Sequence, residues 1–131
     1  MYAIGERING MFRSVAGAIK EQNPEPIQEL AQEQLKAGAQ ALDVNVGPAA
    51  ADPLAAMEWL VKAIREVTEA PLAIDTTKPD VMRRGLELAG PGSIINSCKG
   101  QQEQLDVFVP MAVEHEASLI ALLIDENGIP R

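Results

Sequence analysis

Short runs of β-forming residues alternate along this chain with longer runs of helical periodicity, and this alternation restricts the possible folds more than any other feature. The short runs are rich in Ile, Leu, Val and Ala, and the longer ones repeat apolar residues at every third or fourth position. Strict β-α-β-α order with short turns predicts a parallel sheet joined by right-handed crossovers. We expect strands at 2–5, 41–46, 71–74, 93–96 and 118–124, and helices at 12–22, 24–37, 53–67, 79–89 and 102–116.

Proline and glycine mark the ends of these helices. The pairs Asn23-Pro24 and Asp52-Pro53 combine a capping side chain with a proline at the first helical position. Pro79 opens the helix at 79–89 in the same way, and glycines follow the last apolar positions of two helices. The connections are therefore short, as compact β-α units require.

Two architectures fit this pattern in a single domain over residues 1–131. A doubly wound sheet of five strands would be complete at this length. A (β/α)₈ TIM barrel takes about 250 residues, so the chain would then be a half barrel of four βα units plus strand five. The pattern alone favours the complete doubly wound fold, but the residues at the strand ends reverse that preference.

Composition excludes several functional classes. The net charge of -8 argues against binding to nucleic acid or to an anionic membrane surface. No apolar run approaches the roughly 20 residues of a membrane span. The single cysteine, Cys98, cannot form an internal disulfide, which is typical of a reducing compartment, and we expect a cytoplasmic protein. No group of Cys and His residues has the spacing of metal ligands, so we expect no metal site within the chain.

Each predicted strand leads into carboxylate or amide side chains. The carboxyl ends of parallel strands converge on one face of a sheet, where ligands bind. For any single position, an ordinary alternative is that Asp or Asn caps a helix or a turn. The residues concerned are Glu6, Asn9, Asp43, Asn45, Asp75, Asn96, Asp125 and Asn127.

Asp43 and Asn45 fit the capping explanation less well, because they alternate within one strand and so share a face. Polar groups on a buried face are costly unless they have partners. A ligand rich in N–H donors would provide partners, since a carboxylate accepts two parallel N–H bonds and an amide both donates and accepts. The 2-amino-4-oxopyrimidine edge of a pterin has this character, as do purines and other aminated heterocycles.

Four segments carry a resemblance to a known family. They are Ile-Gly-Glu-Arg-Ile-Asn-Gly-Met-Phe at 4–12, Ala-Leu-Asp-Val-Asn-Val-Gly-Pro at 41–48, Ala-Met-Glu-Trp-Leu-Val at 56–61 and Ile-Asn-Ser at 95–97. Together they closely resemble the methyltetrahydrofolate:corrinoid/iron-sulfur protein methyltransferases, which belong to a wider pterin-binding group with dihydropteroate synthase. The resemblance implies a (β/α)₈ barrel, of which this chain is the amino-terminal half.

The resemblance also implies roles for individual residues. Asp75 and Asn96 are expected to hydrogen-bond the pterin ring, with Asn9, Asp43 and Asn45 at the rim of the same pocket. The family's further pterin aspartate and the asparagine near N5 lie on later strands, beyond residue 131. We identify no catalytic residue within the chain, which is expected to supply half of a pterin site.

The reaction that the resemblance implies moves the N5-methyl group of methyltetrahydrofolate to the cobalt of a corrinoid (cobalamin) carried by a partner corrinoid (iron-sulfur) protein. The resemblance therefore implies a role in one-carbon metabolism, with either the acetyl-CoA pathway or the demethylation of another donor as its setting. The exposed edges of a half barrel lead us to expect a homodimer or pairing with the missing half. The alternatives are a dihydropteroate synthase-like enzyme, or a half barrel that binds pterin or assembles with a partner without catalysis.

Overall fold

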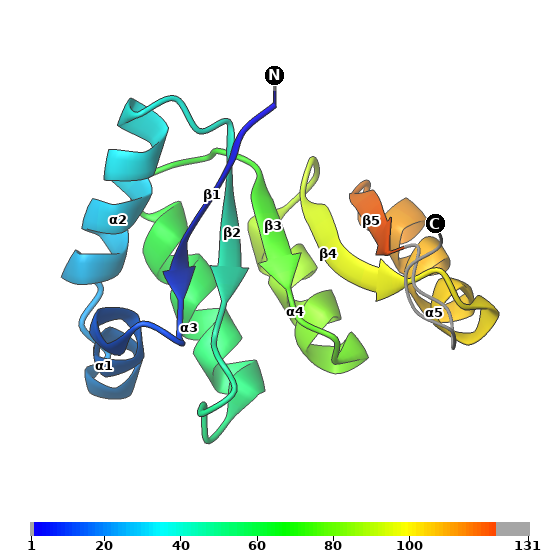
Figure 1. Cartoon of the computed structure of the whole chain (residues 1–131), viewed down its shortest axis with the longest axis horizontal. Coiled ribbons are helices and arrows are strands. Elements are labelled where there is room, and N and C mark those ends of the chain that lie inside the picture. The colour runs from blue at the N-terminus through cyan, green and yellow to red at the C-terminus, as the bar shows by residue number, and fades with distance from the viewer. Residues whose placement is uncertain (1, 123–131) are drawn as a thin grey trace, which may run out of the picture.

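The computed structural model describes residues 2–122, except for the side chains of residues 98, 99, 121 and 122. Strands alternate with helices through this range, with two helices between the first two strands (Figure 1). Their order is β1 (Ile4–Asn9), α1 (Arg13–Glu21), α2 (Glu25–Lys36), β2 (Ala41–Asn45), α3 (Pro53–Arg65), β3 (Leu72–Asp75), α4 (Pro79–Ala89), β4 (Ile94–Lys99), α5 (Gln102–Glu114) and β5 (Ser118–Leu122).

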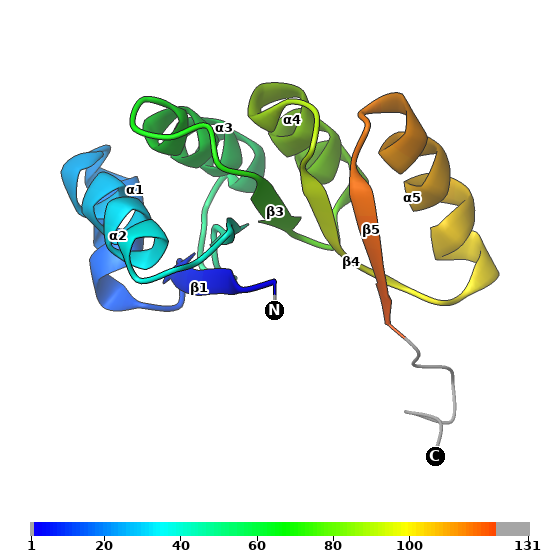
Figure 2. The ribbon, with the colours of Figure 1, turned by 90° about the horizontal axis from the view of Figure 1, so that it is seen from above.

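The five strands form one parallel sheet in the order β1-β2-β3-β4-β5. Each new strand is added on the same side of the preceding one, so right-handed crossovers bring every described helix to the same face of the sheet. Figure 2 shows these helices along one face of a curved sheet whose opposite face is open. A doubly wound sheet would reverse direction and cover both faces. The prediction of a partial TIM barrel is therefore confirmed.

The main hydrophobic core lies between the sheet and the helices. Strand residues such as Leu42, Val44 and Ile74 pack there against Leu60 of α3 and Met82 of α4, and all of these are fully buried. The open face carries a smaller apolar group. It consists of Ala41, Ala73 and Ile94, with Ile4 and Ile120 packed beside them.

Side chains alternate across a strand, so Asp43 faces the same way as Ala41, and Asp75 the same way as Ala73. The second and third strands thus present their acidic side chains on the open face. None of the helices within residues 2–122 has the length and apolar character needed to cross a membrane.

Two strand boundaries differ from the prediction. The first strand runs from Ile4 to Asn9 instead of covering residues 2–5, with one extra β1 residue between Gly5 and Ile8 relative to β2. Glu6 and Arg7 are exposed on this edge strand, so the apolar pattern that marks a buried strand stops early. The fourth strand continues through a bulge to Lys99, which places Asn96 within the strand and not at its end.

The predicted helix signals hold for α3 and α4. The Asp52 side chain accepts a hydrogen bond from the Ala55 N–H at 3.1 Å, and Pro53 is the first residue of α3. Pro79 begins α4, and Gly90 ends it with φ of 85°. The starts of α3 and α4 hold the loops at the carboxyl edge of the sheet in place, whereas Gly90 ends α4 at the opposite edge.

Arg65, at the end of α3, makes several hydrogen bonds at the amino edge of the sheet, where the strands begin. Its guanidinium donates to the backbone carbonyl oxygens of Thr68, Ala70 and Ala89, at distances of 2.7 to 3.2 Å. Carbonyls at helix and turn ends have no partner within their own element, and the planar guanidinium can satisfy several at once. Arg65 therefore ties α3 to the end of α4 and to the turn before β3.

Candidate functional site

Asp43, Asp75 and Asn96 come together on the open face of the sheet and form what we call the Asp43 cluster. Asn96 Nδ2 donates to Asp43 Oδ1 at 2.6 Å, and the Asp75 carboxyl is in hydrogen-bonding contact with the Asp43 carboxyl. Asp75 lies in register with Asn96 on the neighbouring strand. Three strands thus contribute one polar side chain each to the same group.

Asn96 and Asp43 reach each other across β3, although neighbouring strands lie about 4.8 Å apart. Two features allow this. The sheet is curved (Figure 2), and side chains on the concave face of a curved sheet converge. The β3 residue in register with Asp43 is Ala73, which is buried and has only a methyl group. The small side chain leaves room for the polar contact.

The protonation of Asp43 follows from its surroundings. Asp43 is only 3% exposed. The pKa of Asp43 is raised from 3.8 to about 8, chiefly because burial disfavours the charged form. The hydrogen bond with Asp75 and the negative charges of Asp75 and Glu6 raise the pKa as well, whereas the hydrogen bond from Asn96 lowers it. At neutral pH the Asp43 carboxyl therefore carries a proton.

The hydrogen bond to Asp43 also determines which atom Asn96 offers to a ligand. Its Nδ2 group is engaged by Asp43, and none of the described residues donates to its Oδ1 atom. Asn96 is partly exposed, as is Asp75. The cluster thus presents an amide oxygen and a carboxylate, both hydrogen-bond acceptors, on adjacent strands.

Asn9 and Asn45 lie side by side in register at the ends of β1 and β2, and both stabilise local turns. Asn9 Oδ1 accepts from the Met11 N–H at 2.9 Å, and Asn45 Oδ1 accepts from the Gly47 N–H at 2.8 Å. The side-chain oxygen atoms of both residues therefore cap turns, which is the ordinary alternative for Asn at a strand end. Among the hydrogen bonds of the described residues, none joins Asn9 or Asn45 to the Asp43 cluster.

Two glycines hold the loops after β1 and β2 together at this rim. Gly47 has φ of 82°, and a Cβ atom on it would lie 2.6 Å from the carbonyl carbon of Gly10. A Cβ atom on Gly10 would collide with the Val46 carbonyl group. The Gly10 N–H donates to the Asn45 carbonyl at 2.8 Å. Only glycine permits this close backbone approach, which places Asn9 beside Asn45.

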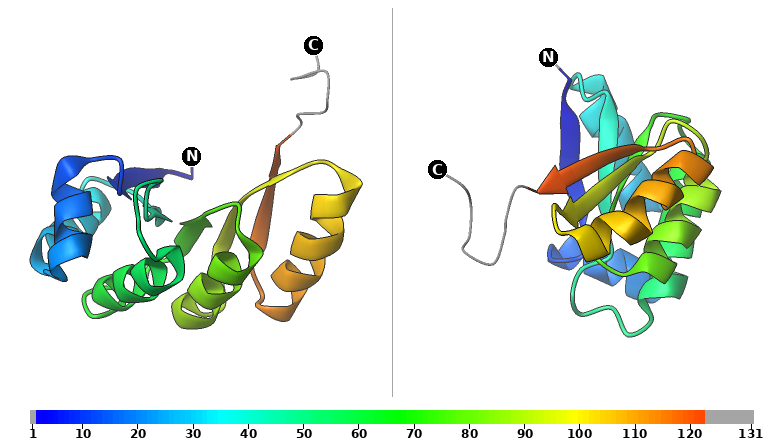
Figure 3. Two further views of the ribbon diagram at one scale, coloured as in Figure 1. Left: turned by 90° about the horizontal axis from the view of Figure 1, so that it is seen from below. Right: turned by 90° about the vertical axis from the view of Figure 1, so that its right-hand side faces the viewer.

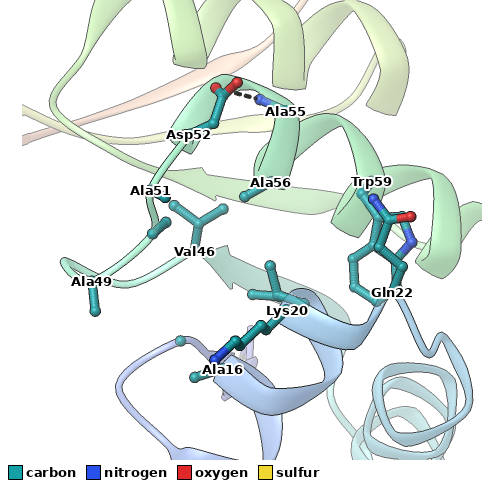
Figure 4. Close-up of a pocket in the computed structure, with 13 residues that line it drawn as sticks. Ala16, Lys20, Gln22, Val46, Ala49, Ala51, Asp52, Ala55, Ala56 and Trp59 are labelled. Carbon is teal, nitrogen blue, oxygen red and sulfur yellow. Dashed lines mark hydrogen bonds between the residues drawn. The ribbon is translucent and has the colours of Figure 1, made fainter.

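A cavity of about 570 Å³ lies on the helical side of the same loops. Figure 4 shows α1, which carries Lys20, and α3, which carries Trp59, on either side of it. Alanines of the 49–56 segment form much of its wall. None of the three cluster residues lines this cavity, so the cluster and the cavity are separate features.

Of the five predicted site residues, the structure joins three and leaves Asn9 and Asn45 at the ends of two neighbouring strands. Asp125 and Asn127 lie outside the described residues. Glu6, which was expected to follow the first strand, lies within β1, and its charge acts on Asp43. Within the described residues, no group of three or more His, Cys, Asp or Glu side chains could hold a metal ion. The free acceptor atoms of the Asp43 cluster could receive hydrogen bonds from N–H donors of a ligand.

The sequence of this chain is similar to those of several known proteins. Methylcorrinoid:tetrahydrofolate methyltransferase of Eubacterium limosum is 32% identical over 99% of this chain and 49% of its own length. The methionine synthase of Mycobacterium leprae is 30% identical over 98% of this chain and 11% of its own length. The corresponding figures for the Mycobacterium tuberculosis methionine synthase are 29%, 98% and 11%.

The chain thus spans about half the length of the first relative and a small part of the methionine synthases. The pterin binding enzyme family matches residues 6–129, which include every element from β1 to β5 apart from the first two residues of β1. By this match, this chain belongs to the pterin-binding enzyme family.

Proposed function

We propose that this chain supplies the amino-terminal half of the pterin site in a methyltransferase that moves the N5-methyl group of methyltetrahydrofolate to the cobalt of a corrinoid protein. The observation that carries the proposal is the Asp43 cluster, which lies on the open face of a partial barrel of the pterin-binding family. The names of its relatives, a methylcorrinoid:tetrahydrofolate methyltransferase and methionine synthases, support methyl transfer as the reaction class.

The acceptors of the cluster suit the pyrimidine edge of a pterin. The Asp75 carboxylate and the Asn96 Oδ1 atom lie on adjacent strands, in register. A 2-amino-4-oxopyrimidine ring presents an amino group next to ring nitrogens, and so needs acceptors spaced along one edge. Recognition would thus rest on charge-assisted and neutral N–H···O bonds from β3 and β4.

Methyl transfer needs a second group that the described residues do not provide. A corrinoid bound to a partner protein would supply, as Co(I), the electron pair that forms the new bond to the methyl carbon, while the C–N5 electron pair returns to N5. A tertiary amine leaves poorly as an anion, so N5 must gain a proton or a strong hydrogen bond in the transition state. We assign this task to residues outside the described half site.

Exposed apolar residues support completion of the barrel by another half. With the exception of Leu54 on α3, the exposed large apolar residues that the structure describes lie near the first strand or on the last helix. They are Tyr2, Met11, Phe12, Val107, Val109 and Val113. Figure 3 places β1 and β5 at the two ends of the sheet. Unpaired strand edges flanked by apolar side chains are surfaces that another β/α unit would cover.

Calorimetric titration of methyltetrahydrofolate into the chain tests the proposal. We expect binding by the wild type, and a loss of about 1–3 kcal/mol of affinity in Asp75→Ala and in Asn96→Ala, because each removes an acceptor from the ligand. Asp80→Ala is the matched control, since Asp80 is an exposed carboxylate in the first turn of α4. If methyltetrahydrofolate does not bind to the folded chain, or binds equally to all four proteins, the half-site proposal is wrong.

A further inference from the structure

The geometry of the Asp43 cluster leads us to propose a further role for its most buried member. We propose that Asp43 is a positioning residue: the proton on its carboxyl group holds Asp75 and Asn96 in the orientation in which both accept hydrogen bonds from the ligand. This inference rests on the proposed function and assigns to Asp43 a task that requires no contact with the pterin itself.

The first step concerns the hydrogen bonds that meet at Asp43. Asn96 Nδ2 donates to Asp43 Oδ1 at 2.6 Å. The same carboxyl group is in hydrogen-bonding contact with Asp75. A carboxylate only accepts, so two carboxyl groups can share a hydrogen bond only if one of them is protonated. The arrangement is complete when Asp43 accepts from Asn96 through Oδ1 and donates its proton to Asp75.

The second step concerns the charges around Asp43. The titratable groups that act on it are Glu6 of β1 and Asp75 of β3, both acidic, and the Asn96 amide reaches it from β4. Within the described residues, no lysine or arginine contributes to its pKa, and the helices pack on the opposite face of the sheet. Burial and the two neighbouring acids together favour the protonated form, with a pKa of about 8.

The third step concerns what deprotonation would change. Without its proton, Asp43 loses the hydrogen bond to Asp75, and two adjacent carboxylates repel each other. Asp75 would then move away from the position in register with Asn96. A ligand that needs both acceptors at once would bind the protonated form, so its affinity would fall as pH rises through the pKa of Asp43.

Asp43→Asn separates this role from a purely structural one. The amide oxygen of the new side chain can accept from Asn96 and its NH₂ can donate to Asp75, so the variant imitates the protonated acid at every pH. With tetrahydrofolate as probe, we expect wild-type affinity to fall about tenfold between pH 7 and pH 9. Asp43→Asn should match the wild type at pH 7 and keep that affinity at pH 9. The exposed control Asp80→Asn retains Asp43 and should lose affinity with pH as the wild type does.

Asp43→Ala completes the binding experiment, because alanine can neither accept from Asn96 nor donate to Asp75. We expect at least a tenfold weaker affinity than that of Asp43→Asn at pH 7. Equal pH profiles for the wild type and Asp43→Asn, or equal affinities for the asparagine and alanine variants, would overturn the inference.

A ligand-free measurement distinguishes failure of this inference from failure of the proposed function. The ¹⁵N-¹H signals of the Asn96 side-chain amide should shift with pH around 8 in the wild type and stay constant in Asp43→Asn. If tetrahydrofolate does not bind but these signals titrate, the proposed function is wrong and the shared proton stands. If the signals do not titrate, the positioning role of Asp43 is wrong, whatever binds.

Discussion

Asn96 and Asp43 are joined side chain to side chain across the strand that separates them, with 2.6 Å between Nδ2 and Oδ1 and 53 positions between them in the sequence. The contact passes over Ala73, whose methyl group is the only side chain in register with Asp43 on β3. Because β2, β3 and β4 each contribute a side chain, the contacts within the cluster depend on the curvature and register of the sheet. Disturbing any of these three strands should change its protonation.

The stability of the chain should depend on pH through Asp43. A carboxyl group whose pKa rises from 3.8 to about 8 on folding binds a proton in the folded state that the unfolded state has lost. Its contribution to the free energy of unfolding is therefore complete below pH 3.8 and declines as pH rises, until it levels off above pH 8. We expect Asp43→Asn to gain stability relative to the wild type by up to about 1.4 kcal/mol for each pH unit between 5 and 7.

Urea unfolding of both proteins at pH 5, 6, 7 and 8 measures this difference directly. Other titrating groups cancel, because the two chains differ at one position. Parallel curves of unfolding free energy against pH would show that Asp43 has the same protonation in the folded and unfolded chain.

The contact between Gly10 and Gly47 should tolerate no side chain. Gly10→Ala places a Cβ atom against the Val46 carbonyl, so we expect a loss of about 1–3 kcal/mol in the free energy of unfolding. Gly17→Ala is the contrasting substitution, since Gly17 lies within α1 and a Cβ atom there meets nothing within 4 Å. It should stabilise the chain by about 0.5–1 kcal/mol. Chemical denaturation of both variants tests the pair, and equal effects would contradict the proposed close approach.

Arg65→Lys should destabilise the fold although it preserves the charge. The lysine ammonium cannot reach the carbonyls of Thr68, Ala70 and Ala89 in the planar arrangement that the guanidinium makes. Leaving partly buried carbonyls without donors costs about 1–3 kcal/mol in total. Arg83→Lys, at an exposed position of α4, should change the unfolding free energy by less than about 0.5 kcal/mol. A similar stability for the two variants would mean that the Arg65 contacts contribute little.

The last helix should mediate association of the chain. Val113 is 75% exposed on α5, which lies next to the edge strand β5. We expect concentrated chain to self-associate, and Val113→Lys to raise the dissociation constant about tenfold, because it removes roughly one buried valine from the contact. Leu54→Lys on α3, away from the sheet ends, serves as control. Sedimentation velocity measures the dissociation constants of the two variants and the wild type. If the wild type is a monomer at all concentrations, the prediction that α5 mediates association is wrong.

Much of the fold is readable from the sequence because it depends on local periodicity. The alternation of strand and helix, the Asp52-Pro53 start of α3 and the Gly90 end of α4 all follow from residues within a few positions of each other. The carboxyl ends of β1 and β4 could not be predicted from the sequence, because these strands continue through the polar residues Glu6, Arg7 and Lys99. An edge strand accepts Glu6 and Arg7 because their side chains can reach solvent, and a bulge lets a strand continue past an irregular position.

The site divides in the same way. The sequence by itself determined which residue types stand near the strand ends, since Asp43, Asp75 and Asn96 occupy positions that any parallel α/β sheet brings to one face. Only the tertiary structure decided that these three touch, that Asn9 and Asn45 turn their oxygens to local N–H groups instead, and that Asp43 holds a proton. The physical reason is that register, curvature and burial arise from contacts between distant residues, and no local pattern specifies them.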